Sequence, residues 1–456
     1  GNMGSTRELA EFVVKTNYRK LPREAVQASK ACLLDWLGVA IGGSKEPVTS
    51  ILVELVKEMG GKRQATVIGR SMKTSVLNAA LVNGTMSHVL DYDDLYHPAH
   101  LHPSATLFPA ILAVAERDHL SGKDVIAAFV LGFETEARIG EVKGAQHLNP
   151  VLRKGWHPTP CLGVFGAAAG AGKLLGLTAE QTVNALGIAC TKAAGMLSAF
   201  GTMSKSLQVG KSAFNGLLAA ELARKGYTGP TEALEGDKGF YQVYIGAPGQ
   251  EQIVADLGKD YRVVHDSFKL YASCGCTHAA LDAVLELRRK HQLKASEIAT
   301  IHCQVWPLTL GIANNSQAST GLEGKFSVQY CVGVALTDGQ AGDEQFGEAR
   351  VQDPEVRNLM AKVRISPNEA FDDRQAIATI TTRKGERFEH KTDCVKGNPD
   401  NPVSREALEG KFRSLSSSII GPDNAEQAVS LISALDKLDD INSLTALLGR
   451  GSRKAR

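Results

Sequence analysis

The sequence of 456 residues lacks the marks of membrane and nucleic-acid-binding proteins. No uncharged run approaches the roughly 18 residues that a transmembrane helix needs, and no basic segment followed by an apolar one stands near its start. Neither sign of charge dominates, because 51 lysines and arginines face 49 aspartates and glutamates, for a net charge of +2. Such a balance does not favour nucleic acid or an anionic membrane as a partner.

Cysteines are few and show no strong metal-binding pattern. The chain has eight of them, scattered and mostly flanked by alanine, leucine, glycine or valine, as buried free thiols are. Free thiols persist in a reducing compartment, which predicts a cytoplasmic location. Cys274 and Cys276 are separated by one residue. No second pair of similar spacing accompanies them, so the zinc signal is weak.

The hydrophobic pattern changes along the chain. From residue 6 to about 250, apolar residues recur at helical spacing with few strand-like alternations. The stretch "ATIHCQVWP" instead places Ile301, Cys303 and Val305 on one face, and "AIATITTRKGERFEH" is typical of two strands joined at Lys384-Gly385. Helical spacing returns after residue 404, where "REALEGKFRSL" begins.

The length and these changes of period predict the domain organisation. A chain of 456 residues is long enough for two or more structural units. We expect a mainly α protein with a large all-helical domain over residues 4–265 and 404–456. A smaller α+β domain over residues 266–403 would interrupt it. Within the helical part, Thr178 three residues before Gln181 is the pattern of a capping box at a helix start.

One glycine-rich stretch, "GVFGAAAGAGKLLG", superficially suggests an ATPase. A phosphate-binding loop needs glycine where Ala167 stands, and serine or threonine where Leu174 follows Lys173. The motif therefore fails at two positions. Glycines at helical spacing instead predict close packing between neighbouring helices, and the residues concerned are Gly163, Gly166, Gly170 and Gly172.

The stretch "LDYDDLYHPAHLHPSA" concentrates acidic and imidazole side chains. The residues are Asp91, Asp93, Asp94, His97, His100 and His102. A metal site is one interpretation, but Pro98 and Pro103 break any helix that would space histidines by four, and no glycine turn of a cation loop is present. The spacing favours acid/base chemistry on a loop between helices. A loop of merely satisfied polar groups remains an alternative.

Four other stretches carry groups of the same kind. "KGWHPTP" holds His157 between Trp156 and a proline, which would desolvate its imidazole. The run "FGTMSKSLQVGKSAFNG" places Lys205 and Lys211 among small and apolar residues, where a surface lysine is an equally good reading. "FKLYASCGCTH" contributes Lys269, and "KFSVQYCVGVAL" contains a tyrosine. The residues alone indicate a cofactor-free helical enzyme for an anionic substrate.

Taken together, these stretches resemble the MmgE/PrpD family over about residues 6 to 450. The most specific are "HVLDYDD…HPSA" and "KSLQVGKSAFNGLLAAELARKGYTGP". The family contains 2-methylcitrate dehydratase, cis-aconitate decarboxylase and iminodisuccinate epimerase. The resemblance implies a helical domain built from both chain ends, an inserted α+β lid domain and a homodimer. It also implies a site between domain and lid that needs neither metal nor cofactor.

The resemblance also implies an active-site set, which consists of Asp91, His102, His157, Lys205, Lys269 and Tyr330. The two lysines would bind substrate carboxylates, because that attraction is far stronger in a closed cleft than in water. The two histidines would move a proton at the carbon next to a carboxylate, with the aspartate orienting an imidazole. The tyrosine would donate a hydrogen bond or a proton to the enolate-like charge.

We therefore predict a lyase acting on a small di- or tricarboxylate, with a hydro-lyase of the 2-methylcitrate dehydratase type as the leading reaction. A cis-aconitate-type decarboxylase and an iminodisuccinate-type epimerase are the alternatives. Asp93, where methylcitrate dehydratases have asparagine, is closer to these two, and Leu95 replaces a hydroxyl residue found in some relatives. A non-catalytic, carboxylate-binding helical module is the alternative of another class.

Overall fold

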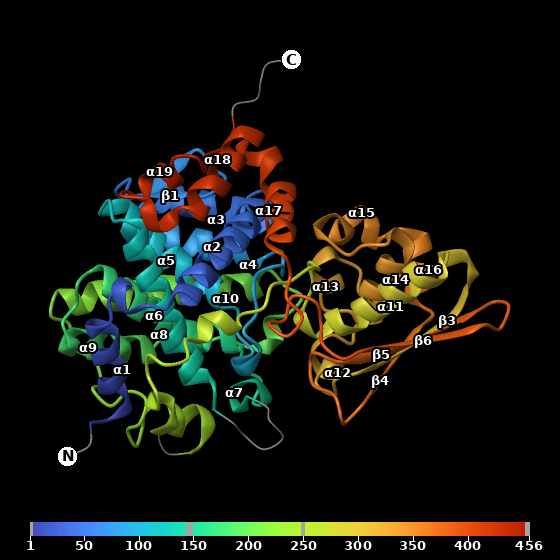
Figure 1. The fold of residues 1–456 in the computed structure, drawn as a ribbon, viewed down its shortest axis with the longest axis horizontal. Coiled ribbons are helices and arrows are strands. Elements are labelled where there is room, and N and C mark those ends of the chain that lie inside the picture. Colours follow the sequence, from blue (N-terminus) through green and yellow to red (C-terminus); the bar gives the residue numbers. More distant parts are fainter. Residues whose placement is uncertain (1–2, 143–148, 248–250, 452–456) are drawn as a thin grey trace.

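The computed structural model describes residues 3–142, 149–247 and 251–451, which form two units (Figure 1). We call residues 3–265 and 404–451 the helical unit, and residues 266–403 the sheet-bearing unit. The apolar core of the helical unit runs from Leu9 to Val263 and continues from Leu408 to Leu448. A separate core, built almost entirely from residues 271–395, lies in the sheet-bearing unit. The predicted mainly α fold class is confirmed.

The helical unit contains thirteen of the α-helices in the described residues, together with a small antiparallel hairpin. The helices are α1 (Ser5–Lys15), α2 (Arg23–Gly43), α3 (Pro47–Met59), α4 (Val76–His88), α5 (Pro103–Arg117), α6 (Gly122–Gly140), α7 (Pro150–Arg153), α8 (Pro158–Leu174), α9 (Ala179–Cys190), α10 (Ser204–Arg224), α17 (Arg405–Ile420), α18 (Pro422–Ser433) and α19 (Asn442–Thr445). The hairpin consists of β1 (Ala65–Val67) and β2 (Met72–Thr74). The predicted capping box is confirmed at the start of α9.

Helices α4, α5, α6, α8 and α10 pack closely because glycines line their contacts. A Cβ atom on Gly163 would lie 2.5 Å from the Thr106 side chain, and one on Gly210 would lie 2.0 Å from Thr85 Oγ1. The helix-packing reading of the glycine-rich stretch is therefore confirmed. The Lys173 ammonium of that stretch donates hydrogen bonds to two carbonyls at the end of α1.

The C-terminal helices complete the helical unit by returning to its N-terminal helices. Figure 1 shows α17 and α18 (red) beside α2 (blue). Gly38 of α2 lies against Phe412 of α17, and a Cβ atom on this glycine would be 3.1 Å from the phenylalanine ring. Residues from both ends of the chain thus form one core. The chain passes from the helical unit into the sheet-bearing unit at residue 266 and returns to the helical unit after residue 403.

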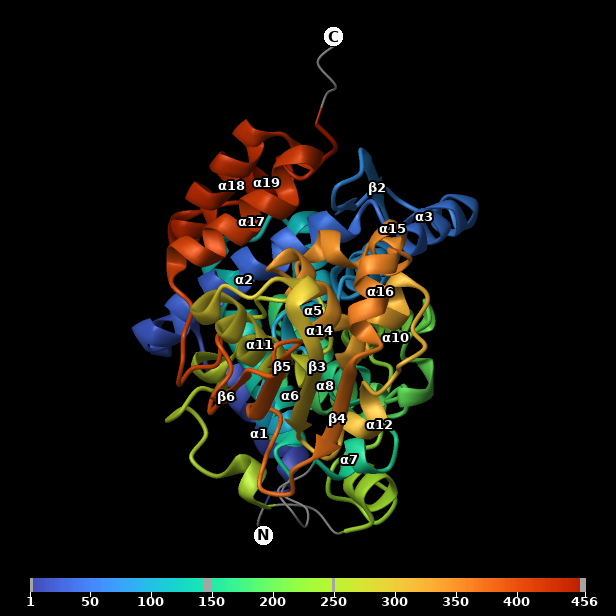
Figure 2. The ribbon, with the colours of Figure 1, turned by 90° about the vertical axis from the view of Figure 1, so that its right-hand side faces the viewer.

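The sheet-bearing unit is a four-stranded sheet with helices packed on it (Figure 2). The strands, in the order β4-β3-β5-β6 across the sheet, are β4 (Val363–Pro367), β3 (Ile298–Val305), β5 (Ala376–Thr382) and β6 (Arg387–Thr392). β3 and β4 are parallel, and the other pairs are antiparallel. The helices are α11 (His278–His291), α12 (Thr309–Ile312), α13 (Gly321–Gly324), α14 (Val328–Asp338), α15 (Glu348–Val351) and α16 (Pro354–Met360).

The strand predictions are confirmed in this unit. Ile301, Cys303 and Val305 are buried on one face of β3. β5 and β6 form the expected hairpin, in which Gly385 adopts a positive φ of 87° that its turn requires. β4 was not predicted from the sequence. None of the helices in the described residues is both long and apolar enough to cross a membrane.

Candidate active site

Four long helices of the helical unit begin or end at one place. α4 ends at His88, α10 begins one residue before Lys205, and α5 and α8 begin directly after His102 and His157. His102 and His157 are each followed by a proline at the first helical position. The N–H of that position has no acceptor within the helix, so a proline there breaks no hydrogen bond. Neither imidazole caps its helix. Because helix N-termini carry partial positive charge, three of these helices favour an anion here.

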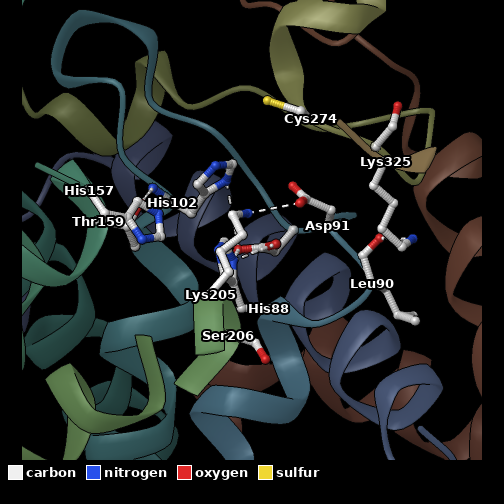
Figure 3. A network of polar contacts seen from close by, with 12 residues as sticks. His88, Leu90, Asp91, His102, His157, Thr159, Lys205, Ser206, Cys274 and Lys325 are labelled. Carbon is white, nitrogen blue, oxygen red and sulfur yellow. Dashed lines mark hydrogen bonds and ion pairs between the residues drawn. The ribbon is translucent and has the colours of Figure 1, made fainter. Parts of the chain in front are cut away.

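The His88 imidazole contacts the other two imidazoles at these helix ends. The ring centre of His88 lies 5.1 Å from that of His102 and 5.8 Å from that of His157. All three rings are largely enclosed, and their grouping is visible in Figure 3. The structure therefore brings together the two predicted histidines, and places between them a third that the sequence reasoning did not single out.

Asp91 joins the two predicted lysines. Its Oδ2 lies 2.8 Å from Lys205 Nζ and its Oδ1 lies 3.0 Å from Lys269 Nζ. Burial alone would raise the pKa of Asp91, but the two ammonium groups outweigh it and hold that pKa well below its usual range. The Asp91 backbone has a φ of 55°, which is uncommon for a residue other than glycine. Its carboxylate thus contacts lysines, whereas the sequence reasoning gave it an imidazole to orient.

Asp93, not Asp91, is the carboxylate that contacts an imidazole. Its Oδ2 lies 2.9 Å from Nδ1 of His88, and burial, which would raise the Asp93 pKa, is outweighed by His88 and His102, which lower it. An ionised carboxylate only accepts, so His88 Nδ1 carries a proton, and in the neutral imidazole Nε2 has the lone pair. That Nε2 atom is buried and has no hydrogen-bond partner among the described residues.

The proton on His102 is placed by a backbone carbonyl. Its Nδ1 lies 2.7 Å from the carbonyl oxygen of Asp94, which can only accept a hydrogen bond. Nδ1 is therefore the protonated nitrogen and Nε2 has the lone pair. Burial lowers the pKa of His102 to about 3, so the imidazole is neutral near pH 7. The His102 imidazole therefore has the lone pair that a general base needs.

His157 has the opposite tautomer. The Gln208 side chain accepts from the backbone N–H of Met196 at 2.7 Å and donates to the carbonyl of the same residue at 3.3 Å, which fixes the orientation of its amide. Its Nε2 then donates to Nδ1 of His157 at 3.1 Å. The proton of His157 is therefore on Nε2. Burial lowers the pKa of this imidazole also, so it is a neutral N–H donor.

The site lies at the seam between the two units, and it is closed in this conformation. Lys325 and Phe326 of the sheet-bearing unit meet His88, Asp91 and Lys205 around a cavity of about 10 Å³. Such a volume is about what one water needs, whereas small-molecule pockets usually have roughly 300–1,000 Å³. An organic acid with several carboxylates does not fit in this volume.

Tyr330 lies elsewhere. Its ring is buried in the core of the sheet-bearing unit, packed against Phe346, and its hydroxyl donates to the carbonyl of Gln345. Burial raises the pKa of this hydroxyl, and the charged groups that act on it, Arg350 and Asp338 among them, belong to the sheet-bearing unit. In this conformation Tyr330 does not join the imidazole and lysine cluster.

Three other residues singled out in the sequence, His97, His100 and Lys211, lie outside the cluster. His97 Nδ1 lies 2.8 Å from Asp373 of the sheet-bearing unit, and His100 stacks on Trp306. Lys211 is exposed, with its ammonium over the ring of Phe214. The eight cysteines all fall within the described residues and are free, as expected.

His88, Asp93 and His102 also have the donor atoms of a possible cation site. One ligand atom of each residue lies within 4.8 Å of the others. In the present arrangement, however, Asp93 accepts a hydrogen bond from His88 Nδ1, and the Asp94 carbonyl accepts one from His102 Nδ1. Both Nδ1 atoms are therefore committed as donors, and a cation would have to use the two Nε2 lone pairs with a reoriented carboxylate.

Residues beyond the predicted set belong to the site. They are His88, Asp93, Gln208 and Lys325, and each stands within one of the stretches that attracted attention in the sequence. Asp93 was noted among the acidic residues but not placed in the active-site set. The pairing of Gln208 with His157 had no sequence signal, because the two residues lie 51 positions apart.

Comparisons with known proteins find matches along most of the chain. A family model described as the MmgE/PrpD N-terminal domain matches residues 7–253, and one described as the MmgE/PrpD C-terminal domain matches residues 271–437. A cis-aconitate decarboxylase of Aspergillus terreus is 31% identical over 98% of this chain and 96% of its own length. The human cis-aconitate decarboxylase is 29% identical, covering 94% and 91%. A probable 2-methylcitrate dehydratase of Saccharomyces cerevisiae is 25% identical, covering 78% and 72%.

Proposed function

The chain belongs to the MmgE/PrpD family, and from this premise we propose that it is a lyase acting on a small polycarboxylate by proton transfer next to a carboxylate. The proposal is carried by one observation. Two ammonium groups, two imidazoles protonated at Nδ1 and one imidazole protonated at Nε2 meet at the seam between the units.

The lysines and the helix ends supply the binding of an anion. Lys205 and Lys269 share the carboxylate of Asp91, and two ammonium groups with one carboxylate leave a net positive charge, which supports the proposal. A substrate carboxylate entering an opened seam would meet the same two charges. In a water-poor site these attractions are stronger than at a surface, and they stabilise the additional charge of an enolate-like transition state.

The imidazoles supply opposite halves of a proton transfer. His102 offers a lone pair at Nε2 and is suited to remove a proton, while His157 offers the N–H at Nε2 and is suited to donate one. His88, oriented by Asp93, adds a second lone pair between them. Positioned proton transfer of this kind contributes roughly 10²- to 10⁴-fold in rate.

Decarboxylation is the reaction that we place first. In it, the bond from the substrate to one carboxylate breaks, carbon dioxide leaves, and the electron pair stays on carbon, delocalised toward a neighbouring carboxylate. An imidazole N–H then protonates that carbon, and the proton is replaced from solvent. The relatives from Aspergillus terreus and human, which match more than nine tenths of this chain, carry the name cis-aconitate decarboxylase, and this favours decarboxylation. Asp93, closer to the decarboxylase and epimerase pattern, agrees with it.

A hydro-lyase of the 2-methylcitrate dehydratase type is the second candidate. It is favoured by the presence of a base and an N–H donor together, since dehydration removes a proton from carbon and adds one to the departing hydroxide. The relative named as a probable 2-methylcitrate dehydratase matches a smaller share of the chain. The iminodisuccinate-type epimerisation would use the same groups without loss of carbon dioxide or water.

Four further predictions from the sequence are retained as parts of the proposal. They are a homodimer, a cytoplasmic location, movement of the sheet-bearing unit as a lid, and a reaction that needs no metal or cofactor. Light scattering measures the first. Dialysis against EDTA tests the last, because activity should be unchanged, and a loss restored by one divalent cation would instead assign His88, Asp93 and His102 to a metal.

A substrate panel tests the proposed function. Purified protein is incubated with cis-aconitate, 2-methylcitrate and iminodisuccinate, while carbon dioxide release, ultraviolet absorbance and optical rotation are followed in parallel. We expect carbon dioxide from cis-aconitate, a loss of about 10²-fold or more in Lys205→Met, and a normal rate in Lys211→Met, a matched change on the exposed side of the same helix.

Two outcomes would contradict the proposal. Turnover at the wild-type rate by both Lys205→Met and His102→Asn would remove the cluster from the reaction. Carboxylates that raise the melting temperature without any turnover would identify the alternative of a non-catalytic, carboxylate-binding module.

A further inference from the structure

Lys325 differs from the other buried lysines in having no carboxylate partner. Among the described residues four lysines are buried. Three of them lie within 3.0 Å of a carboxylate oxygen, in the pairs Lys30–Asp436, Lys205–Asp91 and Lys269–Asp91. For Lys325 no described carboxylate comes within 4.0 Å. A buried charge is unfavourable unless it is paired and hydrogen-bonded, so this ammonium has unused capacity for an anion.

Two of the three N–H donors of the Lys325 ammonium group have an acceptor among the described residues. Its Nζ donates to the carbonyl of Leu90 at 2.6 Å and to the carbonyl of Ala272 at 2.8 Å. It also lies 4.6 Å from the ring centre of Phe346. An ammonium group has three N–H donors, and the described residues accept from two of them. The two carbonyls fix the position of the head group and do not neutralise its charge.

The position of Lys325 relates it to the proposed reaction. Leu90, whose carbonyl it binds, directly precedes Asp91, and Lys325 lines the same small cavity as His88 and Lys205. In the view of Figure 3, Asp91 lies between Lys325 and the histidines. Lys325 also forms part of a cleft of about 440 Å³ that shares Leu322 with the cavity. The residue therefore stands where an opened seam connects the cluster to the surface.

The charges around Lys325 indicate on which side an anion would bind. The outer cleft is lined by acidic residues, namely Glu46, Asp343, Glu344 and Glu348, of which Asp343 is paired with Lys45 at 3.1 Å. A carboxylate is repelled by that outer rim. On the inner side, by contrast, Lys325 lines the small cavity together with Lys205, and Asp91 is the one carboxylate residue among the described residues that line it.

We propose that Lys325 binds a third carboxylate of the substrate, so that the site prefers a tricarboxylate to a dicarboxylate of the same length. The inference rests on the proposed function, because Lys205 and Lys269 would hold the substrate at its other end. Lys325 would bind from the sheet-bearing unit, and the anion would join that unit to the helical unit when the seam closes. Burial lowers the pKa of Lys325 to about 8, and its head group is still mainly protonated at pH 7.

Direct binding of two unreactive acids tests this inference. Propane-1,2,3-tricarboxylate and glutarate have the same chain length and differ by the central carboxylate. Calorimetry measures both with the wild type, Lys325→Gln and Lys45→Met. Glutamine keeps N–H donors for the two carbonyls and loses the charge, while Lys45→Met removes an exposed charge at the outer rim.

We expect Lys325→Gln to weaken tricarboxylate binding by about 10- to 100-fold, the usual contribution of a hydrogen bond to a charged group. Glutarate binding should remain nearly unchanged, and so should both affinities in Lys45→Met. Circular dichroism checks that each variant is folded. Lys325→Arg, which keeps the charge, should retain the preference for the tricarboxylate, and it provides the measurement if the glutamine variant does not fold.

The possible failures are distinguishable. Equal affinity of wild type and folded Lys325→Gln for the tricarboxylate would overturn the inference and leave the proposed function intact, as would an equal loss for both acids. A Lys325→Arg variant without preference would also overturn it. If the wild type binds neither acid, the proposed function fails, and this inference fails with it.

Discussion

The two units hold their functional groups in different ways. In the helical unit, His88, His102, His157 and Lys205 stand at the ends of long, buried helices. In the sheet-bearing unit, Lys269 lies on an irregular segment, and the short helix α13 ends directly before Lys325. The first arrangement fixes the proposed proton-transfer groups together with Lys205. The second places the other two proposed carboxylate-binding groups, Lys269 and Lys325, on a unit with a core of its own.

This difference suggests that the two units have separate roles, one in proton transfer and one in carboxylate binding. Proton transfer depends on distances of a fraction of an ångström, and groups at helix ends are held more accurately than groups on loops. Binding through ammonium groups tolerates more variation, because the attraction between charges falls slowly with distance. Closure of the seam would then add Lys269 and Lys325 to a set of imidazoles that is already in place.

Replacing His102 sharpens the comparison most strongly. In His102→Asn we expect kcat to fall by about 10²- to 10⁴-fold with little change in KM, because a proton-transfer group is lost and the lysines remain. His100→Asn is the matched control on the same loop, since asparagine tolerates the left-handed backbone at that position, where φ is 51°. Steady-state kinetics measures kcat and KM of both variants. An equal loss of kcat in the two variants would contradict the proton-transfer role of His102.

Replacing Lys269 tests the proposed carboxylate-binding role of the sheet-bearing unit. In Lys269→Met we expect kcat/KM to fall by about 10²- to 10³-fold, with a large part of the loss in KM, because a carboxylate-binding charge disappears. Lys290→Met, on the exposed last turn of α11, should have the wild-type value. A Lys269→Met enzyme with normal KM and reduced kcat would break the proposed division between binding and proton transfer.

The glycines of the helical unit provide a test of its rigidity. A Cβ atom in Gly210→Ala would collide with Thr85 Oγ1 and with the backbone oxygen of Leu81, so we expect a loss of about 1–3 kcal/mol or more in the free energy of unfolding. Gly410→Ala in α17 meets no atom within 4 Å and should be neutral or slightly stabilising. Chemical denaturation compares the two, and equal stability would argue against close packing.

The pH dependence of stability tests the buried neutral imidazoles. The pKa of His102 is lowered to about 3 in the folded protein from a reference value of 6.5, so between these values the unfolded chain binds more protons. Stability should therefore decrease as pH falls below 6.5, by at most roughly 1.4 kcal/mol per pH unit for each such imidazole. Thermal unfolding of His102→Asn should show a shallower slope, and an unchanged slope would contradict this explanation.

The smallest effect is expected for Tyr330. In Tyr330→Phe only the hydrogen bond to the Gln345 carbonyl is lost, so we expect a destabilisation of about 0.5–1.5 kcal/mol and a nearly normal kcat. Enzyme assays and denaturation on the same sample measure both. A large loss of kcat in a stable variant would return Tyr330 to the active-site set and require a conformation in which its hydroxyl reaches the imidazoles.

Much of the fold was predictable because its signals are local. The alternation around Ile301 and the turn at Gly385 determine strands through nearest neighbours, and the Thr178–Gln181 capping box determines a helix start within one turn. β4 (Val363–Pro367) was missed because it is short and half-exposed, and its stability comes from the parallel pairing with β3, some sixty positions earlier in the chain.

By itself, the sequence determined which residue types are available, and it placed the acidic and imidazole stretch on a loop between helices, because prolines and the spacing of apolar residues are local properties. Only the tertiary structure decided which groups are partners. It paired Asp93 with His88, gave Asp91 to two lysines, fixed the tautomer of His157 through Gln208, and left Lys325 without a carboxylate. Such partnerships depend on distances between segments far apart in the chain, and burial then sets the pKa values that the chemistry uses.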